Sequence, residues 1–145
     1  LEPKAGLVIR YDFLWQRQQL GGAEHGSKDR PSAVVMVADV NADGAEGSLL
    51  THHTHAADND QSAVEIPVKL AQHLYLDNQK MWIKTNSVNL LNWEVGKIPF
   101  GMTPARPNQW TFGLLPKQIG QEVFAQVMAN IRNKTLRKIT RDKLV

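Results

Sequence analysis

The sequence contains no cysteine among its 145 residues. This absence excludes disulfide bonds and thiol-based catalysis, and it fits a reducing compartment such as the cytoplasm. Long apolar runs are also missing, because the longest ones fall far short of the ~18 residues that span a bilayer. No secretory hydrophobic segment stands at the start of the sequence. We therefore expect a cytoplasmic protein with no membrane association.

Charge of one sign is only mildly in excess. Seventeen Lys and Arg residues face 14 Asp and Glu residues, which gives a formal net charge of +3. A solvated surface explains this excess as well as a polyanionic partner does. A basic tail begins at about residue 132, where Asp142 alone opposes Arg132, Lys134, Arg137, Lys138, Arg141 and Lys143. This tail can screen phosphates, or it can be a frayed, solvated chain end.

What the sequence does contain predicts a mainly β fold in one domain, residues 1–145. The hydrophobic content of 42% suffices for one core, and ten Gly and seven Pro residues predict many turns. Alternating apolar residues from Gly6 to Trp15 are typical of a half-buried strand. The Val-rich run Ala33 to Ala38 predicts a strand buried on both faces. Further strands are expected at Ser48 to His55, at Val64 to Ile66 and within Lys80 to Trp93, about five in all.

Two helices are expected among these strands. A short one is predicted from Val68 to Leu74, because Leu70 and Leu74 are spaced i, i+4. A longer amphipathic helix begins at Pro116, where the missing N–H costs nothing, and runs to about Asn133. Its apolar stripe consists of Ile119, Val123, Val127 and Ile131, with Phe124 and Met128 beside it.

Several motifs occur in a collinear order that covers nearly the whole chain. They are Val8–Tyr11, Phe13–Trp15, Glu24–Pro31, Leu50–His55, Ala63–Pro67, Leu74–Asp77, Trp82 with Asn89 and Trp93, and Phe112–Pro116. As an ordered set they resemble the MazF/PemK family of bacterial type II toxins, in its proteobacterial PemK-like branch. The resemblance implies an SH3-like small barrel with a C-terminal helix, usually dimeric. It also implies a metal-independent endoribonuclease toxin that cuts single-stranded RNA without a cofactor and is silenced by a cognate antitoxin.

RNA cleavage without a metal needs a base for the 2′-hydroxyl, an acid for the leaving 5′-oxygen and a group that stabilises the phosphorane. The planar, permanently charged fork of Arg30 suits the third task. Arg30 ends a long polar loop, Gln16 to Arg30, and Pro31 fixes the backbone that presents it. The resemblance makes Arg30 a catalytic residue; the alternative is a surface arginine paired with Asp29.

The resemblance also implies a phosphate-holding threonine at the end of the third strand. Thr54 takes this place in the alignment, and Thr51 takes it when the alignment shifts. A purely structural β-strand threonine is the third interpretation. Asn89 is expected to line the RNA groove, whereas Trp82 and Trp93 are expected to pack in the core.

Other polar residues can support the chemistry. Glu24, His25 and Lys28 lie in the first long loop, where a carboxylate and an imidazole can share acid–base work, unless the loop has no single critical residue. On a strand, His53 and His55 share one face and His52 points away. A zinc site would need a third ligand, from His25 or Asp58. We expect no metal, and interpret His53 and His55 as lining an RNA groove.

Two alternatives to the nuclease remain. One is a toxin like the gyrase poison CcdB, which binds a topoisomerase through its C-terminal helix and does not need Arg30. The other is a degenerate family member that binds nucleic acid without cutting it. Loss of the usual arginine near Lys97 and the altered strand Thr51–His55 keep this second alternative open.

Overall fold

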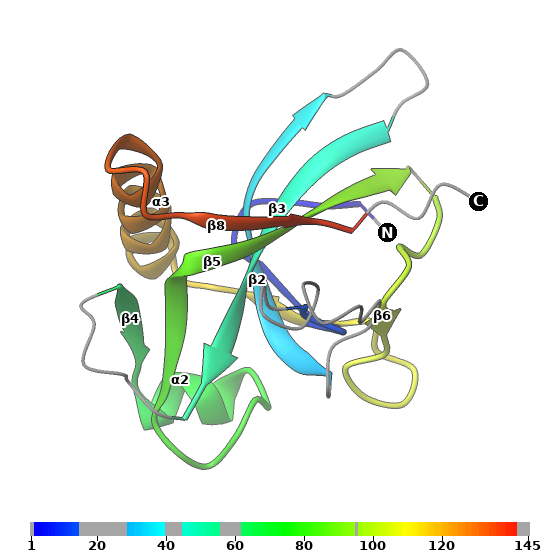
Figure 1. The fold of residues 1–145 in the computed structure, drawn as a ribbon. Coiled ribbons are helices and arrows are strands. Elements are labelled where there is room, and N and C mark those ends of the chain that lie inside the picture. Colours follow the sequence, from blue (N-terminus) through cyan, green and yellow to red (C-terminus); the bar gives the residue numbers. More distant parts are fainter. Residues whose placement is uncertain (1, 15–28, 40–44, 56–61, 95, 142–145) are drawn as a thin grey trace.

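The computed structural model describes residues 2–14, 29–39, 45–55, 62–94 and 96–141, and structural statements below refer to these ranges. Within them the chain is mainly β, with eight strands and two helices (Figure 1). The helices are α2 (Val68–His73) and α3 (Lys117–Arg132). The strands are β1 (Leu7–Tyr11), β2 (Arg30–Asp39), β3 (Ala45–Thr54), β4 (Ala63–Ile66), β5 (Met81–Glu94), β6 (Met102–Thr103), β7 (Thr111–Leu114) and β8 (Arg137–Thr140).

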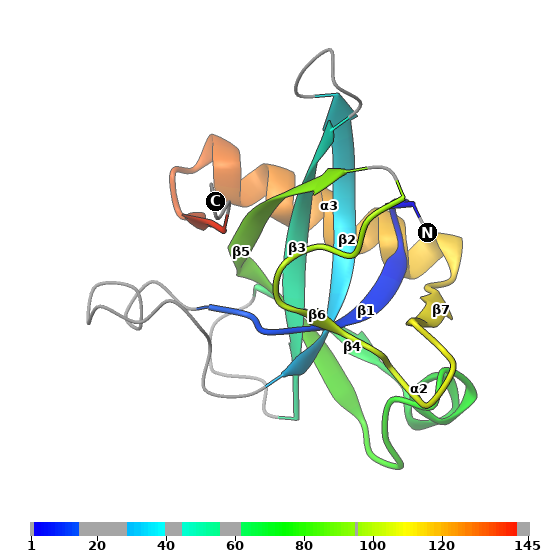
Figure 2. The same ribbon diagram turned by 90° about the vertical axis from the view of Figure 1, so that its right-hand side faces the viewer.

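The strands form one sheet in the order β4-β5-β3-β2-β1-β6. Two further strands add to it, because β7 pairs with β1 and β8 pairs with β5. Every pairing is antiparallel except that of β5 with β8. Seen from the side, β6 lies beside β1 on the opposite side of the sheet from α3 (Figure 2). The predicted mainly β class is confirmed.

Two hydrophobic clusters form the core, and β1 and β2 contribute to both. Val8 and Ala33 pack in the cluster that α3 covers, whereas Ile9 and Val34 pack in the second cluster around Trp93. Successive residues of a strand point to opposite faces, so strands placed between two clusters are apolar on both. The prediction of a doubly buried second strand is confirmed at residues 33–35, and the packing role predicted for Trp93 is confirmed.

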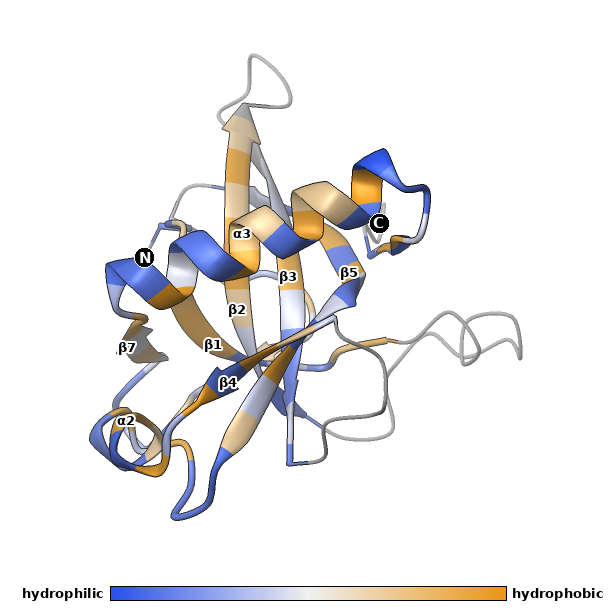
Figure 3. Cartoon of the chain, turned by 90° about the vertical axis from the view of Figure 1, so that its left-hand side faces the viewer, coloured by the Kyte–Doolittle hydropathy of each residue, from blue (hydrophilic) through white to orange (hydrophobic). Residues whose placement is uncertain are grey.

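Both predicted helices are present, and α3 follows Pro116 as expected. It lies across the face of the sheet that includes β2, β3 and β5 (Figure 3). Val123 and Val127 are buried, but Ile131 is 45% exposed. Four-residue steps advance about 40° beyond a full turn, so the predicted stripe drifts off the buried face. Asn130 takes the buried place instead and donates from Nδ2 to the Thr85 carbonyl over 2.9 Å.

The prediction of about five strands is too low. The extra strands β6, β7 and β8 have two to four residues, which is too few for a recognisable period. The basic tail is also corrected, because Arg137–Thr140 pairs with β5 and Ile139 and Arg141 are buried. This part of the tail is therefore not a frayed end. Over the described residues, no helix combines the length and apolar character needed to cross a membrane.

Gly101 offers a test of local packing beside β6. Its φ is +93°, and an added Cβ would lie 3.0 Å from Cε1 of Tyr11. We expect Gly101→Ala to lower the free energy of unfolding by about 1–3 kcal/mol, because both the backbone and the aromatic ring must shift. Urea titration followed by tryptophan fluorescence measures this.

The matched control is Gly120→Ala, at a helical site where an added Cβ meets nothing within 4 Å. It should stabilise the protein by roughly 0.5–1 kcal/mol through helix propensity. Equal effects of the two substitutions would contradict the packing described for Gly101.

Candidate active site

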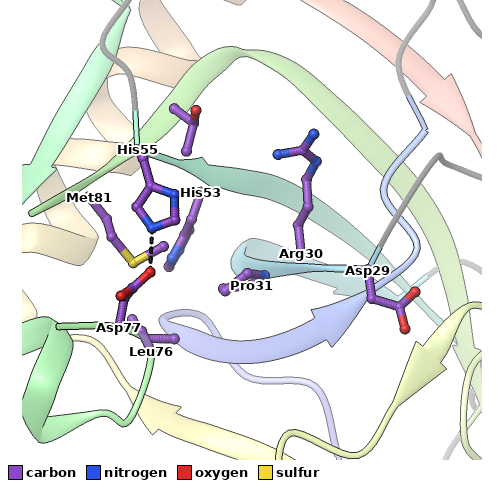
Figure 4. Close-up of a pocket in the computed structure, with 9 residues that line it drawn as sticks. Asp29, Arg30, Pro31, His53, His55, Leu76, Asp77 and Met81 are labelled. Atoms are coloured by element: carbon purple, nitrogen blue, oxygen red, sulfur yellow. Dashed lines mark hydrogen bonds and ion pairs between the residues drawn. The ribbon is translucent and has the colours of Figure 1, made fainter. Parts of the chain in front are cut away.

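A cavity of about 310 Å³ opens where the start of β2 and the end of β3 diverge (Figure 4). Three segments that are far apart in sequence surround it, together with the first residue of β5. Its lining consists of Asp29, Arg30 and Pro31, of His53, Thr54 and His55, of Leu76 and Asp77 after α2, and of Met81.

The strand pairing explains why a cavity lies here. The first part of β2, Arg30–Ala33, pairs with β1, and only the part from Val34 onward pairs with β3. Beyond Leu50, β3 pairs with β5 alone. The two strands therefore separate at this end, and their terminal side chains line the space between them.

Arg30 extends its guanidinium into the cavity from the first residue of β2 (Figure 4). The neighbouring Asp29 points in another direction in this view. The Asp29 Oδ2 accepts a hydrogen bond from Thr103 Oγ1 over 3.0 Å, and Arg10 Nε lies 3.7 Å from the same oxygen. The structure thus engages the carboxylate of Asp29 with Arg10 and Thr103.

The two candidate threonines occupy different environments. Thr54 lines the cavity and is half-buried. Thr51 is fully buried, and its hydroxyl donates to the carbonyl of Ala33 over 3.2 Å. Thr54 is the threonine that shares the cavity with Arg30, while Thr51 has the structural role that the sequence left open.

The histidines alternate as predicted. His53 lies in the cavity wall but is only 1% exposed, and burial, followed by the charge of His52, lowers its pKa to about 3. Neither ring nitrogen of His53 has a hydrogen-bond partner among the described residues. His52 faces the other way and packs on Phe13 with ring centroids 4.5 Å apart. Its pKa is also lowered to about 3, first by burial and then by Arg30 and Lys84.

His55 forms a hydrogen bond at the rim that the sequence did not predict. Its Nε2 contacts Oδ2 of Asp77, and Figure 4 draws this contact as a dashed line. The backbone N–H of Asn78 donates to Asp77 Oδ1 over 2.6 Å, and this bond, followed by that of His55, lowers the pKa of Asp77. No spacing links residues 55 and 77, so only the fold brings them together. The one available signal was the position of Asp77 in the motif Leu74–Asp77.

Asn89 is not part of the cavity, contrary to the prediction that it lines the groove. It is fully buried, and its side chain accepts from the N–H of Leu14 over 2.9 Å and donates to the carbonyl of Leu14 over 2.7 Å. Arg141 Nη1 also donates to its Oδ1 over 3.1 Å. Asn89 therefore fixes the segment after β1.

Three predicted supporting residues, Glu24, His25 and Lys28, lie outside the described residues. The same holds for Asp58, which with His25 was the candidate third metal ligand. In the ranges that are described, no group of three or more His, Cys, Asp or Glu side chains is close enough to hold a metal ion.

Comparisons of the chain with protein-family models, curated proteins and solved structures found no match. The resemblance to the MazF/PemK family therefore stays a prediction from the motifs. The cavity is lined by the permanent cation of Arg30, the hydroxyl of Thr54 and the imidazole of His55, which is hydrogen-bonded to the Asp77 carboxylate. The buried His53 beside them is neutral. Such a set can bind an anionic phosphoester and move a proton.

Proposed function

We propose that this protein is a metal-independent endoribonuclease that cuts single-stranded RNA, as a toxin of the MazF/PemK type. One observation carries the proposal: Arg30 and Thr54, to which the resemblance gives roles from two distant motifs, line the same cavity. They lie on different strands, β2 and β3, whose divergence creates the opening.

In this proposal the substrate supplies its own nucleophile. The 2′-hydroxyl attacks the adjacent phosphorus, and the products carry a 2′,3′-cyclic phosphate and a 5′-hydroxyl. Arg30 donates to the equatorial phosphate oxygens and offsets their charge, and Thr54 donates a further hydrogen bond. The neutral His53 adds no charge that would compete with Arg30 for the phosphate.

The finer fold and the cellular setting belong to the same proposal. We assign the sheet to an SH3-like small barrel, a reading supported by the way β2 pairs with β1 at one end and with β3 at the other. A homodimer in the cytoplasm, silenced by an antitoxin that covers the cavity, completes it. An acidic, partly disordered antitoxin segment would neutralise the charge that attracts RNA.

The test is cleavage of a long single-stranded RNA by the purified protein in excess EDTA. We expect cleavage with 2′,3′-cyclic phosphate ends, and a loss of at least about 10²-fold in Arg30→Ala because a charged donor to the transition state is removed. Lys117→Ala is the control, because Lys117 is an exposed cation at the start of α3 that does not line the cavity. It should cleave like the unaltered protein.

Other outcomes separate the alternatives. RNA binding without cleavage would support a degenerate family member. A gyrase-dependent growth defect without RNA cleavage would support a topoisomerase-binding toxin. Either result overturns the endoribonuclease proposal.

A further inference from the structure

We propose that His55 and Asp77 form the proton-transfer pair of this cavity, in which His55 is the general base and Asp77 orients it. The proposal rests on the endoribonuclease function proposed above, since it assigns the group that removes the 2′-hydroxyl proton.

The geometry gives each residue its role. Asp77 Oδ2 accepts at Nε2 of His55, so the neutral imidazole carries its hydrogen on Nε2 and presents the lone pair of Nδ1. Asp77 is itself held by the N–H of Asn78, which donates to its second oxygen. The His55 side chain is 53% exposed, so a substrate in the cavity can reach it.

The other ionisable groups around the cavity are less suited to this role. Arg30 keeps its charge at all relevant pH values. His53 is buried, and its pKa of about 3 keeps it neutral. Asp29 is engaged by Arg10 and Thr103. Among the described lining residues, His55 is the one exposed imidazole.

The chemical step balances with water as the only co-reactant. The proton of the 2′-hydroxyl moves to Nδ1 of His55 while the O2′–P bond forms and the P–O5′ bond breaks. The leaving 5′-oxygen takes a proton from water, and the resulting hydroxide takes the proton back from the imidazolium. Asp77 stabilises the imidazolium during the step.

The first test compares kcat and KM for His55→Ala and Asp77→Asn. We expect His55→Ala to lower kcat about 10²–10⁴-fold with KM little changed, because a base acts in the transition state rather than in binding. Asp77→Asn should lower kcat at least about 10-fold through loss of orientation. Added imidazole should restore part of the activity of His55→Ala and none of the activity of Arg30→Ala. His73→Ala, at an exposed histidine of α2, is the matched control.

A pH profile separates a base from a merely structural residue. The activity of the unaltered protein should rise with pH, because a general base accepts a proton only in its unprotonated form, and His55→Ala should lose this rise. Tryptophan fluorescence confirms folding at each pH. If the unaltered protein cleaves, Arg30→Ala does not and His55→Ala cleaves normally, the pair is overturned and the endoribonuclease function stands. If the unaltered protein does not cleave RNA, both proposals fail.

Discussion

Arg141→Ala is expected to lower the free energy of unfolding by roughly 3–5 kcal/mol, because it leaves a buried carboxylate without its counter-charge. The side chain of Arg141 is 2% exposed. Its Nη1 donates to the Asp12 backbone carbonyl and its Nη2 lies 3.3 Å from Asp12 Oδ2. Urea unfolding followed by tryptophan fluorescence gives the free energy.

Two further variants make this prediction sharper. Arg137→Ala removes an exposed arginine from β8, the strand that Arg141 directly follows, and should change stability by about 0.5 kcal/mol or less. The double substitution Asp12→Leu with Arg141→Met replaces the ion pair by apolar groups and should recover much of the loss. A single Arg141→Ala variant as stable as Arg137→Ala would show that the buried pair contributes nothing.

The second large effect is a loss of stability in acid. His52 and His53 have a pKa of about 3 in the folded protein, below the ordinary value of 6.5 that the unfolded chain retains. Below about pH 6.5 the unfolded chain therefore binds protons that the folded protein does not, so stability falls as the pH falls toward 3. Between about pH 7.5 and 5 we expect a loss of roughly 2 kcal/mol for each histidine, about 4 kcal/mol together.

Two variants test whether the buried imidazole rings of His52 and His53 cause this loss of stability. His53→Leu replaces the ring by an apolar group and should reduce the pH dependence by about half, because one of two titrating sites is gone. His73→Gln changes an exposed histidine and should leave the dependence intact. Urea midpoints from pH 5 to 7.5 measure both, and an unchanged slope in His53→Leu would contradict the assignment.

The sequence predicted those parts of the cavity that depend on local order. Arg30 was named as a candidate because a charged fork stands beside a proline where a polar loop meets a Val-rich strand, and because the motif resemblance implies a catalytic role for it. The choice between Thr51 and Thr54 could not be made from the sequence, because a shift in alignment register exchanges the two faces of a strand. The structure separates them by burial and by the hydrogen bond of Thr51 to Ala33.

Contacts between residues that are far apart in sequence could not be predicted from the sequence. Asp77 contacts His55 only because the segment between α2 and β5 lies beside the end of β3. Asp12, which follows β1, is buried against Arg141, which lies 129 residues away in sequence. The alternation of apolar and polar residues within one segment cannot predict a contact with a distant segment. Asn89 was misplaced for the same reason, since its partner Leu14 is 75 residues distant.

The change of partner along β2 has a mechanical consequence for the cavity. Arg30 lies on the part of β2 that pairs with β1, and Thr54 lies on the part of β3 that pairs with β5. No backbone ladder joins these two parts directly. A small change in the bend of the sheet near Val34 can therefore widen or narrow the gap between the guanidinium and the hydroxyl while every ladder stays intact. The distance between the two proposed phosphate ligands therefore depends on how far β2 and β3 diverge where their mutual pairing ends.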